Sequence, residues 1–117
     1  MCEPPVVSKL KELERLNVVL YGFETHVCVK QTALDLLEMG YNVHLVVDAV
    51  SSMEHHDRNV GIESIRDAGA SLTTYQSLMF ELMRTCEHPN FKQVLNIVKE
   101  MPKKHLDLHF YNSQDMK

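Results

Sequence analysis

The stretch of residues 17–40 constrains the fold of this chain more than any other part of its sequence. It begins with an apolar run at 18–21 that is too short for a helix and rich in β-branched and aromatic residues, which predicts a buried strand ended by Gly22. From about His26, apolar residues recur at helical spacing up to Gly40. A glycine at that point is typical of a helix whose C-terminal capping residue has the left-handed backbone conformation. A strand, a tight turn and a helix place that turn at the carboxyl edge of a sheet, where open α/β folds bind ligands.

Cys28 falls in the predicted first turn of this helix. Unpaired backbone N–H groups and the helix dipole favour a thiolate at such a position. The local pattern has two interpretations, because a cysteine in an apolar helix is more often a small buried side chain than a nucleophile.

The rest of the chain alternates helices and strands. The apolar spacing predicts helices at 6–17, 53–68, 77–84 and 90–100 and strands at 42–47 and 71–74. We expect Ser51 and Glu54 to form a capping box at the start of the second of these helices. The inward-facing residues predicted for the two middle helices are Val60, Ile62, Ile65 and Ala68, and then Leu78, Met79 and Leu82. Such alternation is typical of right-handed βαβ units and a parallel sheet.

The predicted sheet has only about three parallel strands, fewer than usual, so one edge of the strand at 18–21 lacks a partner. A bare apolar edge is a site for pairing. We therefore expect this edge to be covered by another chain, by a second copy in a homo-oligomer, by a rearranged element, or by further sequence of a longer product.

Composition and charge exclude several function classes. The 117 residues, 44% hydrophobic and 24% charged, predict one domain at 1–102, and the tail at 103–117 has no periodicity and is expected to be poorly ordered. A net charge of −4 gives no reason to expect nucleic acid, and no apolar run approaches the ~20 residues that span a membrane.

Three cysteines without metal-ligand or CxxC spacing favour a reducing, cytoplasmic location. His55, His56 and Asp57 are expected to form a solvated face, because adjacent helical residues point about 100° apart and do not converge on a metal.

The wording of the central motif resembles a known family. The matching residues are Gly22-Phe23-Glu24-Thr25-His26-Val27-Cys28-Val29, then Gln31-Thr32-Ala33-Leu34-Asp35 and Gly40-Tyr41, and later His88-Pro89-Asn90-Phe91-Lys92. They resemble the isochorismatase-like cysteine hydrolases, the superfamily that includes nicotinamidases, and most of all the eukaryotic isochorismatase domain-containing proteins. The likeness covers roughly residues 18–99. It implies a three-layer, Rossmann-like α/β fold with a six-stranded parallel sheet, of which this chain matches the carboxyl-terminal half.

The resemblance also implies a chemistry. Cys28 would attack an amide-type carbonyl to give a thioester that water later cleaves, with the backbone N–H groups of Glu24 and Cys28 as the oxyanion hole. The peptide bond between Phe23 and Glu24 would be cis. No residue of this chain aligns with the aspartate and lysine that assist the family's nucleophile, so we expect the chain to be inactive by itself. The superfamily's metal-binding residues also have no counterpart here, and neither a metal nor a cofactor is expected.

Four residues are candidates to line a pocket beside the thiol: Phe23, Thr25, His26 and Asp48. His26 would either pair with Cys28 or simply be an exposed or pocket-lining residue. Asp48, expected at the end of the strand 42–47, would either reach the pocket as a base or satisfy loop N–H groups before a helix.

Two hypotheses on function remain open. The first is a cysteine-dependent hydrolase acting on an unidentified small molecule. The second is a non-catalytic interaction or oligomerisation module that uses the open sheet edge and the helix at 90–100.

Overall fold

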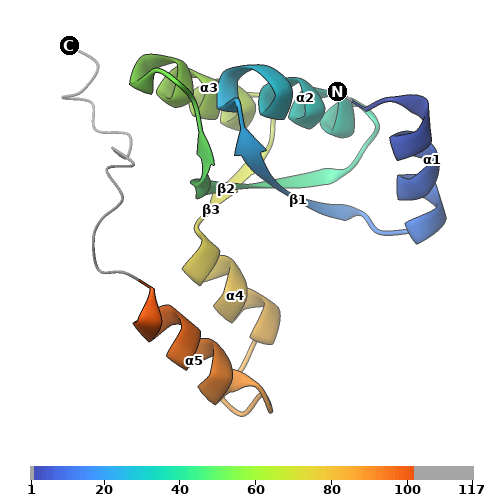
Figure 1. The fold of residues 1–117 in the computed structure, drawn as a ribbon. Helices are drawn as coiled ribbons and strands as arrows, with labels where there is room; N and C mark the ends of the chain where they lie inside the picture. Colours follow the sequence, from blue (N-terminus) through green and yellow to red (C-terminus); the bar gives the residue numbers. More distant parts are fainter. Residues whose placement is uncertain (1, 102–117) are drawn as a thin grey trace.

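The computed structural model describes residues 2–101, and the tail predicted at 103–117 lies outside them. The elements, in chain order, are α1 (Pro4–Leu13), β1 (Asn17–Phe23), a π-helical turn η1 (Thr25–Val29), α2 (Lys30–Glu38), β2 (Asn42–Ser51), α3 (His55–Asp67), β3 (Ser71–Thr73), α4 (Tyr75–Met83) and α5 (Phe91–Glu100) (Figure 1). None of the helices in this range is long and apolar enough to cross a membrane.

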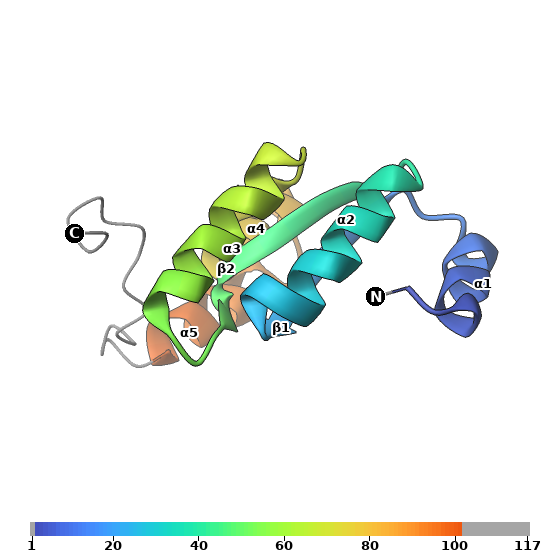
Figure 2. The same ribbon diagram turned by 90° about the horizontal axis from the view of Figure 1, so that it is seen from above.

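The three strands form one parallel sheet in the order β1-β2-β3, as the sequence predicts. Helices α2 and α3 lie side by side on one face of this sheet, and α4 and α5 lie on the opposite side (Figures 1 and 2). The central strand β2 is therefore covered on both faces, which explains its nearly continuous apolar run. The hydrophobic core consists of buried residues from β2, α2, α3 and their connections: Val29, Ala33, Leu36, Val43, Leu45, Val47, Val50, Ile62, Ile65 and Ala70.

The predicted helix end at Gly40 is confirmed. Gly40 has φ +89°, and its N–H donates to the carbonyl of Leu37 at 3.0 Å. The N–H of Tyr41 donates to the carbonyl of Leu36, also at 3.0 Å. These two bonds form a Schellman motif, which satisfies carbonyls that the end of α2 would otherwise leave unpaired.

Both long strands extend further than the apolar runs predict. Gly22 does not end β1, because its φ of +127° lets the strand continue through a shift in register: Leu20 is opposite Leu45, whereas Gly22 is opposite Val50. The extra β2 residues form a bulge, and β2 runs on to Ser51. The expected capping box is therefore wrong, because Ser51 is still in the strand.

The helix bounds differ from the predicted ones for local reasons. Two prolines occupy the first positions of α1, a place that proline favours, and the helix ends at Leu13 because Glu14 is left-handed, with φ 51°. Thr74 starts α4 by accepting a hydrogen bond from the N–H of Ser77 on its side chain. This start precedes the predicted one by two residues.

Some residues predicted to face inward do not. Leu82 is 73% exposed, whereas its neighbour Met83 is buried. Val60 on α3 and Ala68, directly after this helix, are also exposed. The periodicity of α5 is better preserved, because all four residues of its predicted stripe are half-buried: Phe91, Val94, Leu95 and Val98. The rings of Phe80 and Phe91 pack 5.9 Å apart and join α4 to α5.

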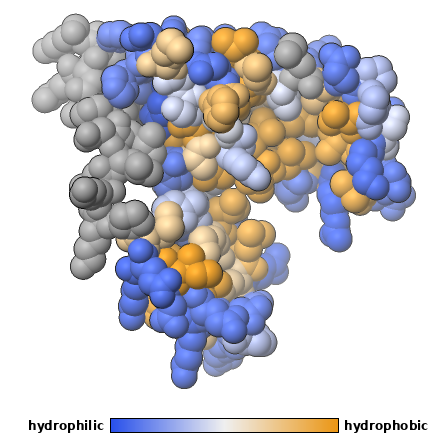
Figure 3. All heavy atoms as spheres, in the orientation of Figure 1, coloured by the Kyte–Doolittle hydropathy of each residue, from blue (hydrophilic) through white to orange (hydrophobic). Residues whose placement is uncertain are grey.

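One face of β1, which is an edge strand of the sheet, carries exposed apolar side chains. Val19, Tyr21 and Phe23 alternate along one face of the strand, and the two aromatic residues are 72% and 77% exposed. Figure 3 shows apolar side chains gathered over the sheet, between α2 above and α4 below. No residue of α1, which lies beside the start of β1, is buried either.

Candidate functional site

The connection from β1 to α2 begins with a cis peptide bond between Phe23 and Glu24, as the resemblance implies. The chain then enters η1, where the carbonyl of Glu24 accepts hydrogen bonds from the N–H groups of Val27 at 3.2 Å and Val29 at 3.1 Å. The bond from Val29 spans five residues, which is the π-helical spacing. Cys28 therefore lies in a π-helical turn immediately before α2 and not in the first turn of an α-helix.

The thiol of Cys28 is accessible. Cys28 is exposed, and it lines a cavity of about 220 Å³ at the end of β1. The residues that line this cavity are Leu20, Tyr21, Gly22, Phe23, Cys28, Val29 and Thr32. Within residues 2–101, no hydrogen bond or ion pair involves the sulfur of Cys28, while its carbonyl accepts a hydrogen bond from the Thr32 hydroxyl at 2.7 Å.

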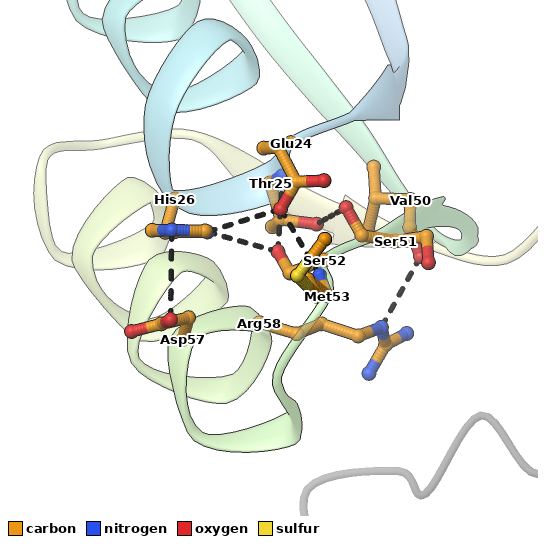
Figure 4. A network of polar contacts seen from close by, with 9 residues as sticks. All are labelled: Glu24, Thr25, His26, Val50, Ser51, Ser52, Met53, Asp57 and Arg58. Atoms are coloured by element: carbon orange, nitrogen blue, oxygen red, sulfur yellow. Dashed lines mark hydrogen bonds and ion pairs between the residues drawn. The ribbon is translucent and has the colours of Figure 1, made fainter.

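The ring of His26 lies in a polar network with Glu24, Ser52 and Asp57 (Figure 4). Its Nδ1 lies 3.0 Å from the Oγ of Ser52 and 3.8 Å from a carboxylate oxygen of Glu24. Its Nε2 lies 3.6 Å from a carboxylate oxygen of Asp57 on α3. Both ring nitrogens thus face groups other than Cys28, and the structure forms no Cys–His pair.

Thr25 and Glu24 join the same network from the backbone side. Thr25 is fully buried: its N–H donates to Ser52 Oγ at 3.2 Å, and its hydroxyl donates to the carbonyl of Ser51 at 2.9 Å. The Glu24 carboxylate accepts a hydrogen bond from the N–H of Met53 at 3.0 Å. The π turn is therefore fastened to the end of β2 and the loop that follows it.

Asp48 lies within β2 and does not end it. Its carboxylate accepts a hydrogen bond from the N–H of Tyr75, the first residue of α4, at 2.9 Å. The carboxylate thus satisfies an N–H group at the start of a helix, but that helix is α4 and not the one that follows β2. Of the four proposed pocket residues, Phe23 lines the cavity beside Cys28, whereas Thr25, His26 and Asp48 are not among its lining residues.

Arg58 supports this region, and sequence reasoning did not identify it. The side chain is only 3% exposed, and its guanidinium donates to the carbonyl of Val47, within the bulge of β2, and to that of Val50, at 3.1 Å, where pairing with β1 resumes. Burial lowers the pKa of Arg58, and the nearby Asp48 carboxylate opposes that effect. An arginine in a helix is ordinarily on the surface, so no sequence signal indicated this role.

Ser52 was missed for a similar reason. A serine in a loop usually hydrogen-bonds to its own neighbours, and only the folded chain shows that Ser52 contacts residues 25 and 26. The motif residues that carry the resemblance do not include Ser52. The contact of Ser52 with the π turn becomes visible only when β1 and β2 pair in the folded sheet.

Comparison with known proteins agrees with this geometry. The Isochorismatase domain matches residues 2–77. Over 102 residues the chain is 42% identical to Isochorismatase family protein 1B of Dictyostelium discoideum, covering 86% of this chain and 50% of that protein. Over 103 residues it is 48% identical to Isochorismatase domain-containing protein 2A of Mus musculus, covering 85% and 50%.

Among solved structures, that of the MAR1 ribonuclease from Caenorhabditis elegans superposes with a TM-score of 0.80 at 47% identity. The match covers 91% of this chain and 55% of that one. The chain thus spans about half the length of the relatives it matches. Its motif, its parallel half-sheet and these relatives together show that the chain belongs to the isochorismatase family of hydrolases.

Proposed function

We propose that this chain carries the nucleophile of a cysteine-dependent amide hydrolase site, with Cys28 as the attacking group. The sulfur would attack an amide-type carbonyl, the amine would leave with a proton from the solvent, and water would later cleave the thioester. The observation that carries the proposal is the exposure of Cys28 beside a cavity at the carboxyl end of β1. A buried structural cysteine would have neither property.

The oxyanion that develops on the carbonyl needs donors, and we assign this role to the backbone N–H groups of Glu24 and Cys28. Both belong to the turn that follows the cis peptide bond. Fixed backbone donors of this kind lower the barrier because they need no reorganisation when the charge appears. The aromatic ring of Phe23 would form one wall of the substrate cavity.

We also propose that this chain by itself does not catalyse repeated rounds of hydrolysis. In residues 2–101 no carboxylate or ammonium group contacts the Cys28 sulfur, so the thiol has neither a proton acceptor nor a charge partner. Removing such partners from a catalytic unit typically costs factors of 10³ or more in rate. The chain should then perform the acylation half of the reaction only with an activated substrate.

A nitrophenyl ester tests both halves of this proposal. The thiolate displaces nitrophenolate from 4-nitrophenyl acetate and keeps the acetyl group as a thioester, which intact-mass and peptide mass spectrometry can locate. We expect one acetyl group on Cys28, a single burst of nitrophenolate, and no ammonia from nicotinamide used as a simple amide. The Cys28→Ser variant is the negative control, and Cys86→Ala, which removes another exposed cysteine, is the matched control.

Two results would overturn the proposal in different ways. Acetylation of Cys86 in preference to Cys28 would exclude Cys28 as the nucleophile. Steady release of nitrophenolate or ammonia, absent in Cys28→Ser, would show that the chain turns over and would refute the inactivity.

RNA belongs in the same substrate panel because the C. elegans relative is named a ribonuclease. The chain has a net charge of −4, so it does not attract a polyanion. We expect a labelled single-stranded RNA to remain uncut, and cleavage abolished by Cys28→Ser would assign a different substrate class to the same thiol.

A second candidate function is an interaction module, and the exposed edge of β1 favours it. Within residues 2–101, β1 pairs with β2 on one side only, and Tyr21 and Phe23 are exposed on this edge strand; such an edge is a template for pairing with another strand. We propose that a second copy of the chain covers this edge. Sedimentation velocity should then show a concentration-dependent dimer that Tyr21→Lys weakens, while Val60→Lys, an exposed apolar position on α3, serves as the matched control. A monomer at every concentration would refute this candidate.

The three free cysteines favour a reducing compartment, and we propose the cytoplasm as the place of action. One relative, from Phytophthora sojae, is named a secreted effector, so the location varies among proteins with this domain.

A further inference from the structure

We propose that His26 is a positioning residue for Cys28, and that its imidazole fixes the π turn by joining the loop after β2 to helix α3. This inference rests on the proposed role of Cys28 as a nucleophile. It assigns His26 a task other than the general base that its place in the motif suggests.

The ring of His26 bridges two segments that are distant in the sequence. Its Nδ1 lies 3.0 Å from Ser52 Oγ, in the loop between β2 and α3, and its Nε2 lies 3.6 Å from the Asp57 carboxylate, on α3 itself (Figure 4). The side chain is about one third exposed, so water only partly competes with these contacts. We call this arrangement of His26, Ser52 and Asp57 the His26 clamp.

The contacts also indicate the tautomer of His26. Ser52 Oγ accepts a hydrogen bond from the N–H of Thr25, and its own hydroxyl hydrogen is then available to Nδ1. An N–H group at Nε2 would then face the Asp57 carboxylate, whose oxygen lies 3.6 Å away. Both nitrogens are therefore occupied in holding the turn, and neither can accept the thiol proton without releasing a partner.

Helix α3 approaches the turn closely at the same place. A Cβ atom added at Gly61 would lie 2.9 Å from the Cα of His26 and 3.1 Å from its backbone nitrogen. Only glycine permits this distance between the two backbones. The backbone of His26 therefore packs directly against α3 at Gly61, next to the side-chain contacts of the His26 clamp.

The position of Cys28 is fixed by the contacts of its neighbours in the sequence. Its own sulfur makes no polar contact within residues 2–101, whereas the residues around it are held: Thr25 is fully buried, His26 is clamped and Val29 is buried in the core. An exposed thiol without contacts keeps a defined place beside the cavity only if the backbone on both sides of it is fixed. On the amino-terminal side, the His26 clamp provides the polar part of that restraint.

The experiment compares the alkylation rates of two exposed thiols in the same molecule. Iodoacetamide is added in less than stoichiometric amount at pH 7, and the modified peptides give the rate at Cys28 relative to Cys86, an internal reference in the loop before α5. The variants are His26→Ala, which removes the clamp, and His26→Asn, whose amide reaches the position of Nδ1 and keeps the contact with Ser52. His56→Ala is the matched control, because His56 is an exposed histidine on the same helix as Asp57.

We expect His26→Ala to change the Cys28 to Cys86 ratio at least fivefold and His56→Ala to leave it unchanged. His26→Asn should restore only part of the ratio, because it keeps the Ser52 contact and loses the Asp57 contact. Hydrogen exchange of residues 24–29 should accelerate in His26→Ala alone. Should this variant fail to fold, Asp57→Asn, which removes the charge facing Nε2, gives a second reading of the same ratio.

The outcomes separate this inference from the proposed function. A wild-type ratio near one would count against Cys28 as the nucleophile and leave the clamp open to the exchange measurement. A ratio and an exchange rate that His26→Ala does not alter, in a folded protein, would refute the clamp, whatever the reactivity of the wild-type thiol.

Discussion

The close approach of α3 to the π turn makes Gly61→Ala a demanding test of the site's architecture. In an ordinary helix this change stabilises the fold by about 0.5–1 kcal/mol, because glycine loses more backbone freedom on folding. Here the new Cβ would lie 2.9 Å from the Cα of His26. The contact is with backbone, which cannot rotate away, and overpacking of this kind costs about 1–3 kcal/mol.

The steric cost should therefore exceed the helical gain, and we expect a net loss of about 1 kcal/mol in the free energy of unfolding. For a domain near this size the melting temperature would fall by roughly 4–8 °C. Because α3 must move outward, the His26 to Asp57 contact at 3.6 Å should lengthen, and amide exchange in residues 24–29 should rise. The assays are a thermal melt by circular dichroism and hydrogen exchange by mass spectrometry.

Val60→Ala provides the matched control, since it adds helix propensity to α3 at a position whose side chain is 54% exposed. We expect it to leave stability equal or slightly higher. If Gly61→Ala is as stable as wild type, or more stable, then helix propensity outweighs the contact and the reasoning on the close approach is refuted.

Three further predictions follow from individual contacts. Arg58→Met should lower the free energy of unfolding by about 3 kcal/mol in urea titrations, because two buried β2 carbonyls lose a charged donor; a loss below about 1 kcal/mol would contradict this. Thr25→Val should cost about 1 kcal/mol through the lost hydrogen bond to the Ser51 carbonyl, and equal melting temperatures would count against that bond. Burial raises the pKa of the Cys2 thiol, so the folded chain keeps this proton to higher pH than the unfolded chain. Stability should then fall as the pH rises above about 8.5, and Cys2→Ala should flatten this part of the melting profile.

Much of the fold could be predicted because local rules and tertiary packing agree in its centre. The apolar runs located all three strands, and the glycine after α2 located a helix end that two hydrogen bonds confirm. Periodicity was less reliable where the sheet leaves a helix partly uncovered: on α4, Leu82 faces solvent and Met83 takes the buried position. A helical pattern indicates that one face is apolar, but only the packing decides which neighbour is buried.

The candidate site was harder to predict than the fold. The motif placed Cys28 in the first turn of the helix after β1, and the structure places it in the π turn that precedes this helix. The motif could not indicate that the turn is π-helical. That geometry arises because the Glu24 carbonyl accepts hydrogen bonds from both Val27 and Val29, and the tertiary contacts of the turn determine this pattern. Nor could spacing show that His26 turns toward Asp57, because these residues meet only when α3 packs on the sheet.

The most direct test of the account is the rate at which iodoacetamide modifies Cys28 relative to Cys86 in the unmodified chain at pH 7. Both cysteines are exposed, so access alone would give similar rates, and any large difference reports on the surroundings of the thiol. The account predicts that Cys28 reacts at least about tenfold faster, because the backbone N–H groups that we propose as the oxyanion hole would also hold the amide carbonyl of iodoacetamide beside the sulfur. Equal rates, or faster reaction at Cys86, would contradict the claim that this turn is built around a nucleophile.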